Sequence, residues 1–164
     1  MNERAIIIAR IVNILIIFTL AISSLYAQKI YKGTSSYMSD IICNVKQEKI
    51  YKGNSSYFSD IIARFDGTSL FKGSSSYLSD IILTYREGKI YKGRSSYNSD
   101  VLATWRDGKM YHKKSSYQSD VLFTYKDNKV YRKNEPYNSS VMFTTSEPVH
   151  PVVLYLIFMN SKDE

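Results

Sequence analysis

The chain of 164 residues has very few of the side chains that most catalytic and metal sites use. It has one cysteine, Cys43, and two histidines, His112 and His150. A lone cysteine cannot form an intramolecular disulfide, so stability must come from packing and backbone pairing. Neither the cysteine nor the histidines lie in a spacing typical of a zinc site, or of a nucleophile with its base. The sequence therefore predicts a non-catalytic protein that uses no metal and no cofactor.

A long apolar run is also absent. Arg4 and Arg10 precede an apolar stretch at 11–21, which Asn13 interrupts, and small and polar residues follow at 23–27. Fewer than the roughly 20 apolar residues of a membrane-spanning helix separate Arg10 from residue 28. The order is that of a signal peptide at 1–27, cleaved after Ala27, with an uncleaved anchor as the alternative. We expect an exported protein, periplasmic or extracellular, with no membrane span after cleavage and no nucleic-acid partner.

The rest of the sequence repeats itself every 20 residues. A formal charge of +7 for the whole chain falls to +6 once Glu3, Arg4 and Arg10 are removed. A fixed period of this length is typical of repeat architectures in which no unit buries its apolar face alone. We assign 28–148 to the repeat domain and 149–164 to an apolar tail. The six rows are KIYKGTSSYMSDIICNVKQE, KIYKGNSSYFSDIIARFDGT, SLFKGSSSYLSDIILTYREG, KIYKGRSSYNSDVLATWRDG, KMYHKKSSYQSDVLFTYKDN and KVYRKNEPYNSSVMFTTSEP.

Each row is predicted to contain two short antiparallel strands. Asp107-Gly108 between two β-rich runs is typical of a type I′ hairpin, in which Trp105 would face Met110. No helical stripe of period 3.6 survives the glycine and serine breaks. Strict alternation puts apolar residues on both faces, so each hairpin needs a neighbour on each side. The two expected faces are Val101, Ala103, Trp105 and Met110 on one side, and Asp100, Leu102, Thr104 and Tyr111 on the other.

The repeat count predicts how the array ends. The chain opens with a second-strand half at 29–33 and finishes with a first-strand half at 139–145. Pairing these halves would close a ring and remove the sheet edges that invite aggregation. The predicted fold class is all-β, a radial (flower-like) or ring-closed array of short antiparallel β-hairpins from six tandem 20-residue repeats, with an open β-solenoid as the alternative.

The recurring pattern KIYKGxSSYxSDVL, with DGKIYKG at the hairpin, resembles the exported bacterial proteins called five-fold β-flower proteins. The resemblance implies a radial arrangement of short hairpins and an exported protein of unknown function. It implies no catalytic or binding residues. Six rows and an apolar tail depart from the five-fold pattern, which leaves five-fold and six-fold closure both open.

Two neighbouring columns of the repeat are candidate binding surfaces. One is aromatic and would suit glycans or quaternary ammonium groups, although a stack of core rings is the alternative. The next column is apolar in its first three rows and polar in its last three, which predicts an interaction patch. The alternative is that the apolar tail folds over these three residues and buries them. The candidate ligand-binding residues are Tyr37, Tyr57, Tyr77, Tyr97 and Tyr117, and the candidate patch is Met38, Phe58 and Leu78.

Charged columns recur as well. Lysines at Lys29 and Lys32, and in most of the rows that follow, would form one basic rim suited to anionic glycans or lipid head groups, or else merely solvated strand edges. A recurring aspartate, such as Asp100 after Ser99, is expected to cap its own turn through backbone amides rather than to bind calcium.

The apolar tail is predicted to be a capping strand or plug, or else an exposed patch for self-association or for a membrane. Taken together, the sequence favours an exported binding or surface-interaction module with a glycan or other cell-surface ligand. A structural, self-assembling envelope protein is the alternative, and an enzyme is less favoured.

Overall fold

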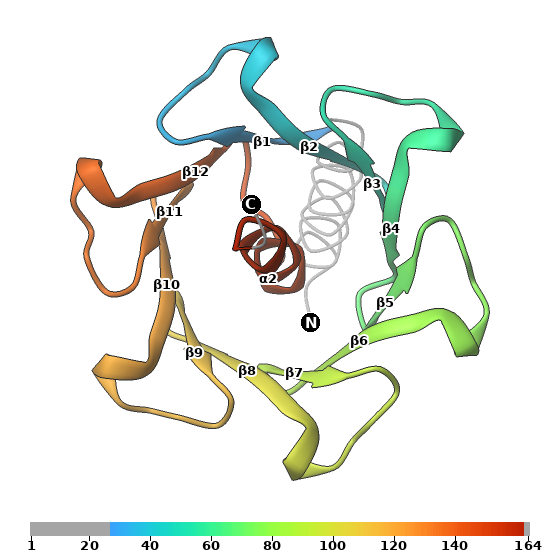
Figure 1. Ribbon diagram of the computed structural model, residues 1–164, viewed down its shortest axis with the longest axis vertical. Coiled ribbons are helices and arrows are strands. Elements are labelled where there is room, and N and C mark those ends of the chain that lie inside the picture. Colours follow the sequence, from blue (N-terminus) through green and yellow to red (C-terminus); the bar gives the residue numbers. More distant parts are fainter. Residues whose placement is uncertain (1–26, 163–164) are drawn as a thin grey trace, which may run out of the picture.

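The computed structural model describes residues 27–162, which form a ring of short strands around one helix (Figure 1). The predicted signal peptide therefore lies outside the described residues except for Ala27. Every strand is antiparallel to its two neighbours, and the sheet closes on itself. The strands are β1 (Gln28–Lys32), β2 (Ile41–Lys46), β3 (Lys49–Lys52), β4 (Ile61–Phe65), β5 (Ser69–Lys72), β6 (Ile81–Arg86), β7 (Lys89–Lys92), β8 (Val101–Arg106), β9 (Lys109–His112), β10 (Val121–Lys126), β11 (Lys129–Arg132) and β12 (Val141–Thr145).

Ring closure occurs between the two half-units, as predicted. β1 pairs with β12 through Ile30 and Thr145, Tyr31 and Thr144, and Lys32 and Phe143. This pairing excludes the open solenoid. Because a closed sheet has no free edge, none of the twelve strands exposes an unpaired row of backbone groups.

Two kinds of connection join the strands, one at each rim of the ring. Tight turns join each even strand to the next odd strand at what we call the turn rim. At Asp107 and Gly108 both φ angles are positive, +51° and +73°, which confirms the type I′ turn. A Cβ on Gly108 would lie 2.9 Å from the Tyr125 carbonyl oxygen, so no larger residue fits there without movement.

Longer petal loops join each odd strand to the next even strand at the opposite rim, the loop rim, and project outward (Figure 1). Each petal loop ends in a single 3-10 turn. These turns are η1 (Met38–Asp40), η2 (Phe58–Asp60), η3 (Leu78–Asp80), η4 (Asn98–Asp100), η5 (Gln118–Asp120) and η6 (Asn138–Ser140).

A β-bulge in every even strand changes which side chains face the ring interior. Ile90 pairs with Ala103, but the next pair is Tyr91 with Val101, so Leu102 is the extra residue. Leu102 packs against the central core together with Ala103 and Met110. The predicted alternation was therefore wrong at Val101 and Leu102, which exchange faces because the bulge interrupts the period of two.

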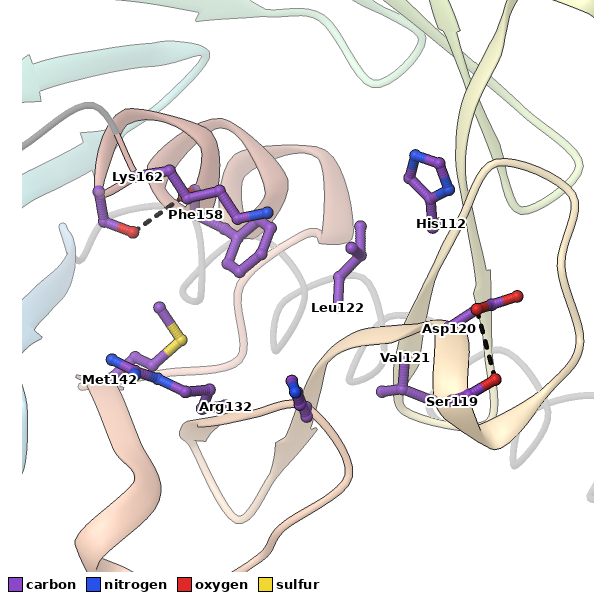
Figure 2. A pocket seen from close by; sticks show the side chains of 11 residues that line it. His112, Ser119, Asp120, Val121, Leu122, Arg132, Met142, Phe158 and Lys162 are labelled. Carbon is purple, nitrogen blue, oxygen red and sulfur yellow. Dashed lines mark hydrogen bonds between the residues drawn. The ribbon is translucent and has the colours of Figure 1, made fainter.

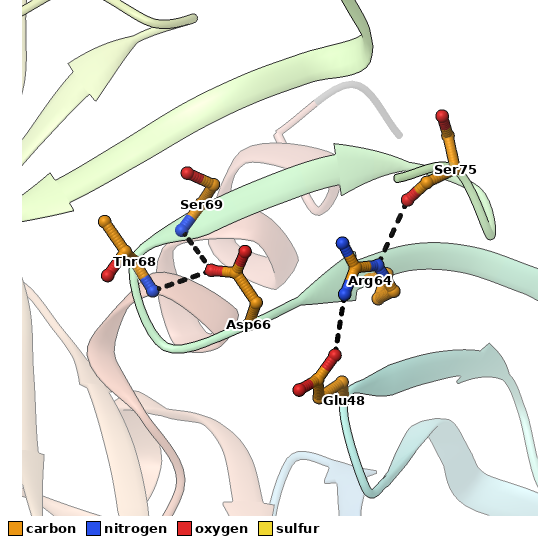
Figure 3. Close-up of polar contacts among 6 residues, drawn as sticks. All are labelled: Glu48, Arg64, Asp66, Thr68, Ser69 and Ser75. Atoms are coloured by element: carbon orange, nitrogen blue, oxygen red, sulfur yellow. Dashed lines mark hydrogen bonds and ion pairs between the residues drawn. The ribbon is translucent and has the colours of Figure 1, made fainter. Parts of the chain in front are cut away.

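A polar residue in the middle of each even strand fastens the following petal loop. Thr84 Oγ1 donates to the Gly93 carbonyl oxygen at 2.7 Å, and Thr104 Oγ1 donates to that of Lys113 at 2.7 Å. In the same column Arg64 donates from Nε to the Ser75 carbonyl oxygen at 3.1 Å and forms an ion pair with Glu48 at 2.7 Å (Figure 3). These bonds hold the petal loops in fixed positions relative to the ring.

The tail is a helix, α2 (Pro151–Asn160), and not the predicted capping strand. It lies inside the ring (Figure 1), where it buries Val152, Val153 and Leu154 almost completely. A closed sheet offers no edge to another strand, whereas a helix satisfies its own backbone groups in an apolar interior. Pro151 suits the first turn, where its missing N–H costs nothing. The tail does fill the interior of the ring, as the predicted plug would, but it does so as a helix and not as a strand.

Candidate functional site: a cavity at the loop rim

A ring of basic side chains surrounds the loop rim. The last residue of each odd strand is basic and exposed, and the register places them all at this end. The only ion pairs among the described residues are Arg64 with Glu48 and Arg106 with Asp107, so this ring has no acidic partner within residues 27–162. This basic ring consists of Lys32, Lys52, Lys72, Lys92, His112 and Arg132.

Just inside the basic ring lies a ring of apolar side chains supplied by the bulges. Leu102, Leu122 and Met142 pack against the central core, and Ile42 is still 38% exposed. Sequence analysis missed this ring because it assumed unbroken alternation. We call it the apolar ring, and it consists of Ile42, Ile62, Ile82, Leu102, Leu122 and Met142.

A cavity of about 1130 Å³ lies between the ring and the last turn of α2. A second cavity, of about 500 Å³, adjoins it (Figure 2). Arg132, Met142 and Ser161 border both cavities. One column of the repeat meets α2 and the larger cavity differently around the ring, and both Cys43 and Phe143 of that column line this cavity. Phe123 packs against Phe158 of α2 with ring centroids 5.2 Å apart, whereas the small Cys43 borders the larger cavity.

The two cavities together carry a positive charge. Among the lining residues within 27–162, Asp120 and Glu135 are acidic and five are lysine or arginine, so the charges of these described residues sum to +3 with His112 counted as neutral. The C-terminal end of α2 adds only about half a negative charge. An anion is therefore the favoured occupant. The five basic lining residues are Lys32, Lys52, Arg132, Lys133 and Lys162.

The aspartates of the petal loops are engaged within their own loops. Ser75 Oγ donates to Asp80 Oδ2 at 2.5 Å, and the Tyr77 backbone N–H donates to Ser75 Oγ at 3.1 Å. The same arrangement recurs in the first five petals. The predicted local role is confirmed, but the carboxylate bonds a serine hydroxyl and not the backbone amides that were expected. Within residues 27–162 no group of three or more His, Cys, Asp or Glu side chains could hold a metal ion.

In the sixth petal loop the acidic residue and the serine exchange places. Glu135 stands where the others have serine, and Ser140 stands where they have aspartate. Ser140 Oγ donates to the carbonyl oxygens of Glu135 and Tyr137, the latter at 2.8 Å. No side chain within residues 27–162 bonds the Glu135 carboxylate, and Glu135 borders the larger cavity.

The predicted tyrosine site is exposed but is not brought together. Tyr37, Tyr57 and their equivalents are 73–75% exposed and stand on separate petals. The alternative of a core stack was therefore wrong for this column. The rings of a second aromatic column, at positions 31, 51, 71, 91, 111 and 131, include the buried Tyr91 and Tyr111. Glycan binding by Tyr37, Tyr57, Tyr77, Tyr97 and Tyr117 stays a prediction.

The predicted apolar patch is also free of the tail. Met38, Phe58 and Leu78 are 61%, 72% and 58% exposed, and α2 lies inside the ring instead of over them. The alternative that the tail covers the patch was wrong. An interaction role for these three residues stays a prediction.

The lysines form two rims and not the single rim expected. Lys49 pairs with Lys46 beside the tight turn, and Lys89 pairs with Arg86 in the same way, so this column lies at the turn rim. Glu87 in the turn dilutes the charge there. Only the column that includes Lys32 and Lys52 reaches the cavity.

Comparison with known proteins identifies the family. Residues 30–155 match the family model described as "6-fold beta flower protein". The chain belongs to this family. Its six hairpins, counting the pair of β12 with β1, settle the closure of this β-flower as six-fold where the resemblance named a five-fold family. No curated protein and no solved structure matches the chain. Among residues 27–162 no helix has the length and apolarity needed to cross a bilayer.

Proposed function

We propose that this β-flower protein is an exported, non-catalytic binding protein that takes an anionic ligand at the loop rim. One observation carries the proposal. Three side chains of the basic ring, Lys32, Lys52 and Arg132, line the larger cavity, and none of them has an acidic partner within the described residues. A concave, low-dielectric surface lined by one sign of charge concentrates counter-ions and raises their association rate. The ligand class fits an anionic glycan or a lipid head group.

The chemistry of the cavity wall supports a non-catalytic role. Burial raises the pKa of the Cys43 thiol to about 12, so this side chain stays protonated and is a poor nucleophile. His112 stands in the lysine column of the basic ring, and the other histidine packs against Phe65 and Tyr85 beside α2. Activated nucleophiles and general bases need a partner that shifts their pKa, and Cys43 is shifted in the opposite direction.

Charge neutralisation at one rim tests the proposal. The chain is titrated with immobilised acidic glycans, with vesicles containing phosphatidylglycerol, and with neutral counterparts of both. We expect binding to anionic probes only, with an affinity that falls as salt rises. Replacing Lys32, Lys52 and Arg132 together by glutamine should abolish it. The matched control replaces Lys49, Lys89 and Lys129, which removes the same charge from the turn rim and should change binding little. Equal losses in both variants would show that net charge alone attracts the probes.

A second candidate function is surface attachment through the petals. Tyr57 and Phe58 are 75% and 72% exposed on a loop that hydrogen bonds make rigid. Exposed apolar residues in such a setting are typical of interfaces with a glycan surface or with another copy of the chain.

A further inference from the structure

We infer that the ligand of the loop-rim cavity is a single-chain amphiphile with an anionic head group, bound with its alkyl chain between α2 and the apolar ring. The inference rests on the proposed function and specifies its ligand class. Its basis is that the cavity has a polar, basic mouth and apolar walls.

The basic ring and the apolar ring lie next to each other on the same hairpins, with the basic ring nearer the loop rim. Lys52 pairs with Cys43, and the bulge residue Ile42 is the neighbour of Cys43 in the chain. A cation therefore stands beside an apolar side chain at the edge of the cavity. The same juxtaposition brings Arg132 near Leu122 and Phe123. A ligand that satisfies both levels must carry a charge at one end and an apolar body at the other.

The walls favour an alkyl chain over a sugar. The apolar lining includes Ile62, Met142 and Phe143 from the strands, and Ile157 from α2. A glycan ring would lose its water on these walls without gaining hydrogen bonds, at a cost of about 1–3 kcal/mol for each unsatisfied hydroxyl. The polar lining is confined to strand ends, petal loops and the C-terminal end of α2, including Lys32, Ser140, Asn160 and Ser161.

The cavity is too large to be filled by an inorganic ion alone. At about 1130 Å³ it lies just above the range of roughly 300–1,000 Å³ that is typical of small-molecule sites. Carboxylate and phosphate head groups both suit Lys32, Lys52 and the forked guanidinium of Arg132.

Chain length is the decisive variable for the test. Isothermal titration uses alkyl carboxylates and alkyl phosphates of 6 to 12 carbons, each below its micelle concentration, with inorganic phosphate and an uncharged alkyl maltoside as controls. The form beginning at Gln28 contains all twelve strands and α2, and it is measured beside the full chain. For the form beginning at Gln28, the affinity should rise about fourfold for each methylene group of the ligand that is buried. If all four added methylenes are buried, the affinity should rise roughly 200-fold from the 8-carbon to the 12-carbon ligand. The two head-group series distinguish a carboxylate from a phosphate ligand.

Two substitutions in one column locate the alkyl chain. The test substitution is Ile42→Ser, because Ile42 lines the cavity. The control is Ile82→Ser, because Ile82 occupies the same position in another hairpin and does not line the cavity. Both isoleucines are 38% exposed, so the two variants should lose similar stability. Only Ile42→Ser should weaken binding of the 12-carbon ligands, by at least tenfold. Equal effects of the two substitutions would contradict this location.

The outcomes separate the inference from the function on which it rests. Binding of inorganic phosphate and short chains as strong as that of long chains would overturn the amphiphile while leaving an anion site in place. Binding of the uncharged maltoside as strong as that of the anions would overturn the head-group assignment. If no anion of any length binds to the form beginning at Gln28, both proposals are wrong.

Discussion

His150 should make the folded ring sensitive to mild acid. It is the N-cap of α2, and its Nδ1 accepts a hydrogen bond from the Val152 backbone N–H at 3.3 Å. Its ring packs between Phe65 and Tyr85, with centroids 4.6 and 4.7 Å away. Burial lowers the pKa of His150 below its usual value of 6.5. A protonated imidazole has no free lone pair, so protonation removes the cap.

The direction and size of the effect follow from these contacts. Between the lowered pKa of the folded state and the unfolded value of about 6.5, the unfolded chain binds more protons, so the free energy of unfolding rises with pH. The contribution is complete above about pH 6.5 and is lost as pH falls. A lost N-cap costs about 1 kcal/mol. Attraction between the imidazolium and the rings of Phe65 and Tyr85 stabilises the protonated folded state by about 0.5–1 kcal/mol and so opposes the loss of the cap. The cost of burying the positive charge cancels part of this attraction.

Urea denaturation between pH 7 and pH 5 measures the balance. The free energy of unfolding should fall by about 1 kcal/mol in the wild type. It should change little in His150→Asn, because asparagine keeps a cap acceptor that does not titrate. His112→Gln is the matched control and should keep the wild-type fall, since His112 is exposed on the loop rim. A wild-type curve that is flat or rises toward pH 5 would show that the aromatic contact outweighs the cap.

Three further predictions test packing, backbone strain and the petal surface. Leu154→Ala, at a fully buried position of α2, should cost about 3 kcal/mol in urea denaturation, whereas Met159→Ala, at a position 41% exposed, should cost less than about 1 kcal/mol. Lys113 has φ of +50° in a column otherwise held mainly by glycine, so Lys113→Gly should stabilise by about 1 kcal/mol while Lys114→Gly should not; equal effects would contradict the strain. Phe58→Asp should leave the melting temperature unchanged and reduce any self-association seen by light scattering, and an unchanged oligomeric state would rule out this patch.

The repeat pattern was sufficient to predict the fold because most rows contain a turn signal and the fixed period extends the hairpin to Gln47-Glu48, where the signal is missing. Asp107-Gly108 specifies the hairpin, and the half-units at the two ends specify closure. The conformation of the tail was not predictable from its own residues, since an apolar run of eight is compatible with a strand or a helix. What decides between them is the absence of a free sheet edge, which is a property of the closed ring.

The cavity was harder to anticipate because it depends on the bulges. Strict alternation places Val101 inward and Leu102 outward, and the structure reverses them. One sequence signal was present. Every even strand begins with two consecutive large apolar residues, such as Ile41-Ile42 and Val121-Leu122, where a half-exposed strand would alternate. Two adjacent apolar residues with different environments are typical of a bulge that turns one of them to the other face.

In the proposed function, departures from the repeat decide which side of the ring offers the binding site. Six identical hairpins would present six equivalent grooves around the axis, and none would be preferred. A single helix inside the ring makes the grooves unequal, because Phe158 packs against Phe123 on one side, whereas Cys43 and Phe143 line the larger cavity. Glu135 and Ser140 alter the petal at the edge of that space and nowhere else in the ring. The basic ring surrounds the whole loop rim, and the side-chain differences among the hairpins place the larger cavity, which is the proposed binding site, on one side of it.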